Sequence, residues 1–429
     1  MIHGKDRLER IQRYYNGVGT AGTTICCSAA LALAVASPLT IAAPKVRAPS
    51  QVERPGSLPP SKQSRAATDR TPLSLFPLTV AWTLALNSAI TGPPAYDDTR
   101  GYFPIEGDRI AAYDLTHGTQ LWVASATANM EPAVGDGLVY LAEPGALAAL
   151  HATDGSIAWN VPLADALAVP LVWDNGWLVA ATSASTILAF RASDGQLIWR
   201  RDIGAPAHAP PTLAADRVYV PTHDGRVVAL RVDTGAPVWE HRLGGAANEI
   251  LALDERLYFG SKDRFFYCLN TSDGKEEWRW RTGGDAIGRP LVDERTVYFV
   301  ALDNVLRALN RNSGVQRWKS PLPLRPGSGP AKAGDTIVVA GIAPTLLGYN
   351  AMDGKAAGAL PTNGEIAAPL HVFNDSMRPL PVLIVLTRDI AKGATVTALM
   401  RSIEPAIVAI APLPNAIPLT LTAPRLTTP

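Results

Sequence analysis

A glycine that follows a short strand-like run recurs along the chain at a nearly constant spacing. The stretch from Ala229 to Trp239 shows the pattern: an apolar run, a tight turn at Gly235, and a second run that carries a tryptophan. The turn glycines lie 37 to 40 residues apart, and they are Gly118, Gly155, Gly195, Gly235, Gly274, Gly314 and Gly354. A fixed period of this size is typical of a repeat architecture, so it constrains the fold more than any single motif does.

Three further positions recur in phase with the turn glycines. The sixth residue before each glycine is small, and its members are Ala112, Ala149, Ala189, Ala229, Cys268, Ala308 and Gly348. The residue after it is large and apolar, and its members are Tyr113, Leu150, Phe190, Leu230, Leu269, Leu309 and Tyr349. Four residues after the glycine the chain has Trp122, Trp159, Trp199, Trp239, Trp278 and Trp318, whereas the seventh copy has Gly358.

Each recurring position has a physical reason. A hairpin turn that ends in a bulge needs a residue with positive φ, which glycine adopts without a Cβ clash. A small side chain suits a crowded inner position where strands converge. Tryptophan supplies a large apolar area, which suits it to filling the wedge between two neighbouring sheets. The glycine at position 358 therefore predicts that the seventh junction between sheets opens first.

Each unit of about 40 residues holds roughly four short strands, which is the size of one propeller blade. Trp82 precedes Trp122 by one period, and at the other end Pro381–Leu386 and Ala394–Leu399 are strand-like. The sequence therefore predicts an all-β, eight-bladed β-propeller of four-stranded antiparallel blades. We expect the N-terminal strand around Trp82 to pair with the C-terminal blade, which closes the ring and removes its free edges.

A proline opens most blades, and the residue before it recurs eight times, at Gly92, Glu131, Val169, Ala209, Glu249, Arg289, Gly329 and Ala368. Loops of this kind converge on one mouth of the central channel. The ionisable members are Glu131, Glu249 and Arg289, and His208 and Asn248 lie one position earlier in their blades. These five residues are either a solvated, self-paired rim or a recognition site for a peptide or small ligand.

The repeated Ala-Leu-x-x-x-x-Gly-x-x-x-Trp pattern resembles the PQQ-like repeat of eight-bladed propellers over about residues 78–403. That family includes quinoprotein dehydrogenases, an outer-membrane assembly scaffold of the BamB type, and sensor domains of membrane kinases. The resemblance implies, for the enzymes, a quinone above the ring, a calcium site, a catalytic aspartate and usually a disulfide between adjacent cysteines. Here the adjacent cysteines are Cys26 and Cys27, outside the repeats, and the long insertions of the enzymes are missing.

The termini predict export. Residues 14–44 carry no charge, and their apolar centre, Ile25–Ala36, follows a basic start, so residues 1–43 are interpreted as a signal peptide or a membrane anchor. The sequence before Cys26 and Cys27 is a poor lipidation signal. Residues 44–77 are a Pro/Ser-rich linker, and residues 404–429 are a Pro-rich tail that either lies along the propeller or remains disordered.

Signatures of common catalytic sites are missing from the sequence, including Gly-x-Ser-x-Gly, His-Glu-x-x-His, Walker and Cys-x-x-Cys motifs. The net charge of +1 gives no basic field for nucleic acid. Cys268 is expected to be a buried thiol. We therefore expect no catalytic, cofactor-binding or metal-binding residues, and a monomeric, non-enzymatic scaffold at the periplasmic or extracellular face of the membrane that binds protein partners. A PQQ-dependent dehydrogenase and an extracytoplasmic sensor or ligand-binding module are the alternatives.

Overall fold

The computed structural model describes residues 74–374, 380–389 and 393–402 of the chain. Within these residues the regular structure consists of strands without a helix. The strands form eight antiparallel sheets arranged as the blades of a ring, as the sequence predicts. The predicted signal or anchor segment with Cys26 and Cys27, most of the predicted linker and the whole of the predicted tail lie outside the described residues.

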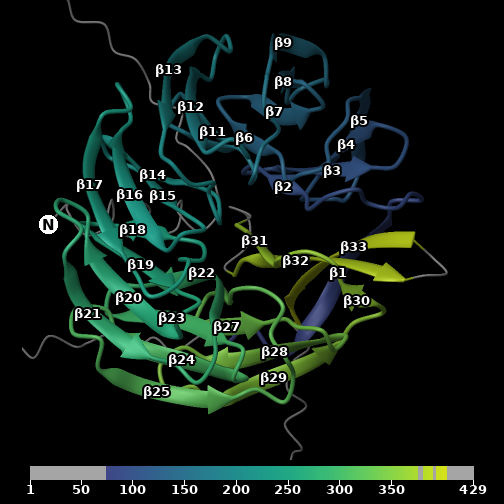
Figure 1. Ribbon diagram of the computed structural model, residues 1–429. Coiled ribbons are helices and arrows are strands. Elements are labelled where there is room, and N and C mark those ends of the chain that lie inside the picture. The colour runs from purple at the N-terminus through teal and green to yellow at the C-terminus, as the bar shows by residue number, and fades with distance from the viewer. Residues whose placement is uncertain (1–73, 375–379, 390–392, 403–429) are drawn as a thin grey trace, which may run out of the picture.

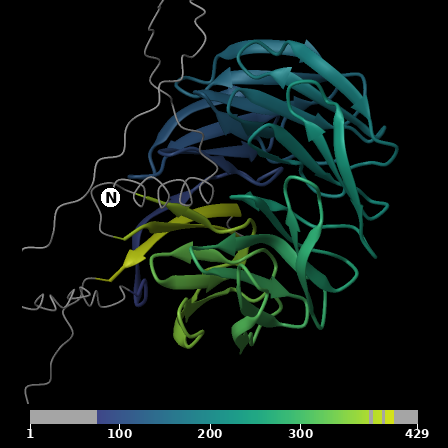
Figure 2. The ribbon, with the colours of Figure 1, turned by 90° about the vertical axis from the view of Figure 1, so that its left-hand side faces the viewer.

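The ring runs in chain order from blue through teal and green to yellow in Figure 1, and Figure 2 shows it from the side. Within each blade the strands are given from the innermost to the outermost. Blade 1 contains β2(Ala95–Tyr96), β3(Arg100–Ile105), β4(Arg109–Asp114) and β5(Gln120–Ser125), and blade 2 contains β6(Ala133–Gly135), β7(Leu138–Glu143), β8(Ala146–His151) and β9(Ile157–Pro162). Blade 3 contains β10(Val172–Asp174), β11(Trp177–Ala181), β12(Thr186–Arg191) and β13(Leu197–Asp202), and blade 4 contains β14(Thr212–Ala214), β15(Arg217–Pro221), β16(Arg226–Arg231) and β17(Pro237–Arg242).

Blade 5 contains β18(Leu251–Leu253), β19(Arg256–Gly260), β20(Phe265–Asn270) and β21(Glu276–Arg281), and blade 6 contains β22(Ala286–Val292), β23(Thr296–Ala301), β24(Val305–Asn310) and β25(Gln316–Pro321). Blade 7 contains β26(Ala331–Ala333), β27(Thr336–Val339), β28(Thr345–Asn350) and β29(Ala356–Pro361). Blade 8 contains β30(Glu365–Ile366), β31(His371–Phe373), β32(Val382–Asp389) and β33(Gly393–Arg401), together with β1(Leu78–Ala85) from the N-terminal side. In blade 8 the innermost position is shared by β30 and β31, which both pair with β32.

The first and last strands close the ring. β1 pairs antiparallel with β33, and Trp82 lies opposite Ala398. Figure 1 shows the purple strand beside the yellow one. The predicted closure by the strand around Trp82 is confirmed. Because this pairing completes blade 8, the ring has no break, and the edges that remain are the outermost and innermost strands of each blade.

The turn glycines have positive φ, and a register shift follows each hairpin, as predicted for a turn with a bulge. They also have a second role, which is to receive the tryptophan of the preceding blade. A Cβ placed on Gly235 would lie 2.5 Å from Cε3 of Trp199. The indole Nε1 of Trp199 then donates a hydrogen bond of 2.7 Å to the Val232 carbonyl of the same neighbouring blade.

All seven blade tryptophans, from Trp82 to Trp318, repeat this contact with the next blade. The small residue six before the glycine lies directly opposite a tryptophan in the same blade, as Ala229 lies opposite Trp239. Its place is therefore the third strand rather than an inner position near the ring axis. The predicted wedge role of tryptophan is confirmed, and the small side chain leaves room beside the indole.

The seventh junction is filled by a residue that the repeat does not contain. Phe76 precedes β1 and lies against both Gly348 and Gly358, where an added Cβ would come within 2.3 and 2.4 Å of its ring. Phe76 is buried, and Leu75 beside it is fully buried in the same apolar cluster. Gly358 therefore does not leave this junction unfilled, and that the junction opens first stays a prediction. The two glycines make room for the aromatic ring of Phe76, which lies just before the first strand of the propeller.

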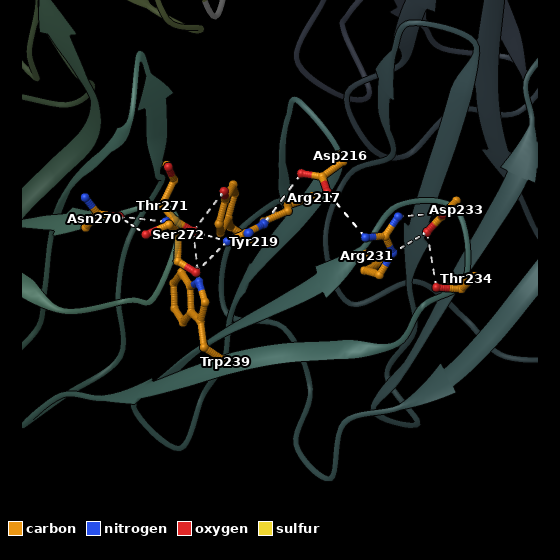
Figure 3. Close-up of polar contacts among 10 residues, drawn as sticks. All are labelled: Asp216, Arg217, Tyr219, Arg231, Asp233, Thr234, Trp239, Asn270, Thr271 and Ser272. Carbon is orange, nitrogen blue, oxygen red and sulfur yellow. Dashed lines mark hydrogen bonds and ion pairs between the residues drawn. The ribbon is translucent and has the colours of Figure 1, made fainter. Parts of the chain in front are cut away.

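A network of polar contacts reinforces the junction between blades 4 and 5. The Thr271 carbonyl accepts hydrogen bonds from Nε1 of Trp239 and from the guanidinium of Arg217, and the Tyr219 hydroxyl lies 3.5 Å away (Figure 3). Arg217 also donates to the Ser272 carbonyl at 2.8 Å. The half-buried Thr271 carbonyl thus has more than one donor, which satisfies its hydrogen-bonding capacity.

Candidate functional site

Three charged side chains from the predicted channel mouth interact with one another. Glu131 precedes β6 of blade 2, Glu249 precedes β18 of blade 5, and Arg289 belongs to β22 of blade 6. All three side chains are exposed to solvent. Each carboxylate interacts electrostatically with Arg289, and Glu249 acts on Glu131. Blades 5 and 6 are neighbours, so Glu249 lies beside Arg289, and Glu131 of blade 2 faces both charges across the centre of the ring.

The surrounding protein raises the pKa of the Glu131 carboxyl to about 7, the negative charge of Glu249 adds to this shift, and Arg289 opposes it. Burial also raises the pKa of Glu249, and Arg289 again opposes the shift. A side chain that is both solvent-accessible and desolvated enough to shift its pKa faces a confined volume of water. This setting is the one expected of a residue that lines a narrow channel.

The strand register shows that the eight residues predicted to share one position at the blade openings do not all share it. In blade 2, Glu131 lies two residues before Ala133, which pairs with Tyr140 of the second strand. In blade 4 the residue two before Thr212, which pairs with the equivalent Tyr219, is Pro210 rather than Ala209. The same offset in blades 1, 3 and 8 replaces Gly92, Val169 and Ala368 by Pro93, Pro170 and Pro369. Glu131, Glu249, Arg289 and Gly329 therefore share this position with four prolines.

His208 of blade 4 and Asn248 of blade 5 occupy matching positions in the segments that lead into the innermost strands. The backbone N–H of each donates to the end of the second strand in its own blade, at the carbonyls of Pro221 and Gly260. The Asn248 side chain donates a 2.6 Å hydrogen bond to the Ala286 carbonyl of blade 6. It therefore ties blade 5 to the strand that carries Arg289.

The imidazole of His208 forms a pair with His223, whose Nδ1 lies 3.2 Å from its own Nδ1. Burial lowers the pKa of His208, and the positive charges of Lys262 and His223 lower it further, whereas a hydrogen bond with Asn248 raises it. The five predicted residues thus form two neighbouring groups, one around Arg289 and one around His208, which Asn248 connects.

Three residues that the sequence reasoning missed extend the channel lining. Asp174 ends the innermost strand of blade 3; burial raises the pKa of its carboxyl, and Arg289 opposes this shift. Tyr96 of blade 1 stacks on His371 of blade 8, with ring centroids 4.0 Å apart. Burial lowers the pKa of His371 to about 3. Each of them belongs to an innermost strand of two or three residues, which is too short to give a signal in the sequence.

Glu131 makes stability depend on pH, and the sign follows from the direction of its shift. The folded carboxyl keeps its proton up to a pH of about 7, whereas in the unfolded chain the pKa is near 4.5. Stability from this group is therefore present at low pH and is lost as pH rises from 4.5 to 7. As the pH rises from 4.5 to 7, the melting temperature of wild type should therefore fall relative to that of Glu131→Gln, whose amide does not titrate.

The matched control for this titration is Glu106→Gln, since Glu106 is an exposed glutamate in a turn of blade 1. Its difference from wild type should stay nearly constant between pH 4.5 and 7. A constant difference for Glu131→Gln as well would contradict the enclosed setting of that carboxyl.

The donor groups of the described residues are dispersed. Three or more His, Cys, Asp or Glu side chains do not gather at any point of residues 74–374, 380–389 and 393–402 in a way that could hold a metal ion. Cys268 is buried, and burial raises the pKa of its thiol to about 12, so it is a poor nucleophile. A search of the same residues finds no helix able to cross a membrane.

Two curated proteins are similar to parts of the chain. The outer membrane protein assembly factor BamB of Yersinia pestis is 32% identical over 97 residues, which cover 21% of this chain and 25% of that protein. The tetrathionate hydrolase of Acidithiobacillus ferrooxidans is 28% identical over 169 residues, which cover 32% of this chain and 34% of the hydrolase. The chain thus matches about a quarter to a third of the length of these relatives.

Solved structures share the fold at low sequence identity. BamB from Moraxella catarrhalis superposes with a TM-score of 0.61 at 20% identity, over 75% of this chain and 97% of that chain. Quinohemoprotein alcohol dehydrogenase from Comamonas testosteroni gives a TM-score of 0.61 at 14% identity, over 75% of this chain and 76% of that chain. These two similarities concern the fold alone.

The family whose model matches the chain is described as outer membrane protein assembly factor BamB, and the matched segments are residues 77–168, 146–253 and 243–380. Together the three segments span residues 77–380, from just before β1 to just before β32, which is well over half of the chain. The protein therefore belongs to the family of the outer membrane protein assembly factor BamB.

Proposed function

We propose that this protein is an exported, non-enzymatic scaffold that binds a protein partner in the cell envelope through the channel mouth. Membership of the BamB family supports the scaffold role, and the name of the Yersinia pestis relative supports a link to outer-membrane assembly. The basic, then apolar, start of the sequence supports export. We include in this proposal that the protein acts as a monomer and carries no cofactor.

The observation that carries the proposal is Arg289, an exposed guanidinium that interacts electrostatically with Glu131, Glu249 and Asp174. A planar guanidinium binds a carboxylate through two parallel hydrogen bonds. A strand of a rigid ring holds such a group in place at low entropic cost, which is how scaffolds present binding residues. An acidic side chain or a terminal carboxylate of a peptide is the ligand that fits Arg289.

Two relatives keep an enzymatic role as the second candidate, since one is named a hydrolase and one a dehydrogenase. The resemblance to quinoproteins implies a calcium site beside the cofactor, and calcium needs six to eight oxygen ligands. The described residues around Arg289 do not offer a matching donor set. Quinone-like absorbance in protein purified from its native envelope would favour the dehydrogenase over the scaffold.

Arg289→Ala should abolish partner capture while changing the melting temperature little, because interactions between solvent-exposed charges contribute about 0–1 kcal/mol. The measurement is affinity capture from solubilised envelope, followed by mass spectrometry. Enrichment of an outer-membrane assembly component by wild type, and its loss with Arg289→Ala, is the expected result.

The control for this capture is Arg281→Ala, which removes an exposed arginine from the outermost strand of blade 5. This variant should capture the partner as wild type does. If the triple change of Glu131, Glu249 and Arg289 to alanine leaves capture intact, the channel mouth is not the binding site. If Arg289→Ala unfolds the propeller, the residue has a structural role instead.

A further inference from the structure

Two histidine rings of blade 4 face each other beside the channel mouth. His208 lies in the segment that leads into β14, and His223 lies in the turn between β15 and β16. Their Nδ1 atoms are 3.2 Å apart. His223 is exposed and His208 is half-buried, so the pair can be reached from solvent. The binding role proposed for Arg289 makes no use of these two rings.

The backbone holds the two histidines in this position. The N–H of His208 donates to the last carbonyl of β15 at 2.8 Å, and the N–H of His223 donates to the Pro206 carbonyl at 3.0 Å. Between these two hydrogen bonds Ala207 and Thr222 form an isolated antiparallel bridge, and both residues are buried. The histidine pair is therefore built on a fixed part of the ring.

The two rings approach each other at an angle rather than end to end. A strong hydrogen bond between two imidazoles is nearly straight, which would place the ring centroids farther apart than the two nitrogens by almost a full ring width. The centroids of His208 and His223 are only 4.6 Å apart, and the ring planes are inclined at 77°. This geometry is unlike a straight hydrogen bond, and it suits two nitrogen lone pairs that converge on a third atom.

The distance between the nitrogens matches that of two ligands on one metal ion. Imidazole nitrogens bind Zn²⁺ at about 2.0–2.1 Å in tetrahedral sites, so two of them lie about 3.3 Å apart. The Nδ1 atoms of His208 and His223 are 3.2 Å apart. Imidazole is a ligand for Zn²⁺, Cu²⁺ and Ni²⁺, whereas Ca²⁺ and Mg²⁺ prefer oxygen. The pair therefore has the chemistry and the spacing of a transition-metal site.

Asn248 of blade 5 orients one of the two rings. Its side-chain amide donates a 2.6 Å hydrogen bond to the Ala286 carbonyl, which fixes the amide and leaves its oxygen to act as an acceptor. Burial lowers the pKa of His208, whereas a hydrogen bond with Asn248 raises it, as expected if this oxygen accepts a proton from the ring. Histidines that bind metals are usually held in this way, with one ring nitrogen donating and the other facing the metal.

The charges around the pair act in two directions. Burial, Lys262 and His223 together lower the pKa of His208, so its ring is neutral near pH 7, which is the state that binds a metal. The charge of Lys262, in the turn between β19 and β20, opposes a bound cation. Asp224 follows His223 but is engaged by Arg226, at 2.7 Å. A metal at this place is therefore favoured most when an anionic ligand completes its shell.

We propose that His208 and His223 bind one divalent transition-metal ion, Zn²⁺ or Cu²⁺, through their Nδ1 atoms. Among the described residues a third His, Cys, Asp or Glu ligand does not join the pair. Two positions of a tetrahedral ion therefore remain open to water or to a carboxylate of a partner protein. This proposal departs from the sequence-based expectation of no metal-binding residue, and it does not depend on what binds Arg289.

Calorimetric titration with Zn²⁺ tests the proposal on the full chain, purified without a histidine tag and freed of metal by a chelator. Wild type should bind one Zn²⁺ per chain. His208→Ala and His223→Ala should each weaken binding by about tenfold or more, because each removes one of the two donors. The double variant should not bind. The matched control is His151→Ala, which removes an exposed histidine at the end of β8 and should bind as wild type does.

Electron paramagnetic resonance of wild type with one equivalent of Cu²⁺ counts the ligands directly. The spectrum should show two imidazole nitrogens, and one in each single variant. This count in wild type keeps the test valid if a variant does not fold. Zn²⁺ should also raise the melting temperature of wild type but not that of the double variant. Absence of binding by wild type, or equal binding by the folded double variant, would overturn the proposal and leave the pair as two hydrogen-bonded histidines.

Discussion

Trp199→Ala is expected to lower the free energy of unfolding by about 3–5 kcal/mol, the usual cost of truncating a buried large aromatic residue. The Trp199 side chain is only 8% exposed, and its ring covers Gly235 of the next blade. Its truncation removes the apolar contact between blades 3 and 4 and also leaves the Val232 carbonyl without its indole donor. Chemical denaturation monitored by circular dichroism measures the effect.

Two phenylalanine variants separate the apolar contact from the hydrogen bond. Trp199→Phe leaves the Val232 carbonyl without the only side-chain donor that the described residues provide for it, at a cost of about 1–3 kcal/mol. Trp239→Phe should cost less, because the Thr271 carbonyl keeps its hydrogen bond from Arg217 (Figure 3). Equal costs for the two variants would show that the carbonyls do not contribute to the difference.

The fold could be predicted from the sequence because its signals are local. The turn glycine, the small residue and the tryptophan of one copy lie within eleven residues, as in Ala229–Trp239, and each is required by one hairpin and its neighbour. Seven copies in phase then reveal the blade count, and closure follows from the unmatched Trp82. The physics that sets each position acts over a short stretch, so it is visible without a structure.

Phe76 could not be predicted in the same way. It lies outside the repeat, and its partners Gly348 and Gly358 are more than 270 residues away in the sequence. The sequence shows two missing side chains in blade 7, but it does not show which distant residue fills the space. Only the closed ring brings the start of the chain beside blade 7.

The candidate site could be predicted from the sequence only in part. The recurrence of proline identified Glu131, Glu249 and Arg289 as members of one rim, and their mutual electrostatic effects agree with that placement. The alignment of blades 1, 3, 4 and 8 differs by one residue, because a strand can begin one or two residues after the proline without changing the period. Asp174 and the Tyr96–His371 stack belong to strands of two or three residues, which are too short to show a pattern.

The closing junction depends on Phe76 in the way that the other junctions depend on tryptophan. Phe76→Ala should therefore lower the free energy of unfolding by about 3–5 kcal/mol, although the residue belongs to no repeat. The site cannot collapse easily, because the ring of Phe76 lies against two glycines that have no side chains to fill the cavity. Denaturation curves of the variant and wild type provide the measurement.

The residue that would restore the repeat at this junction should instead damage it. Gly358→Trp recreates the tryptophan position of the other blades, but the Phe76 ring already lies within 2.4 Å of where the new Cβ would be. We expect this single substitution to lower the free energy of unfolding by about 1–3 kcal/mol through overpacking. Combined with Phe76→Ala, it should cost less than the sum of the two single changes, because the alanine vacates the space that the indole needs. If Gly358→Trp is as stable as wild type, or if the two effects add, Phe76 does not occupy the place of the missing tryptophan.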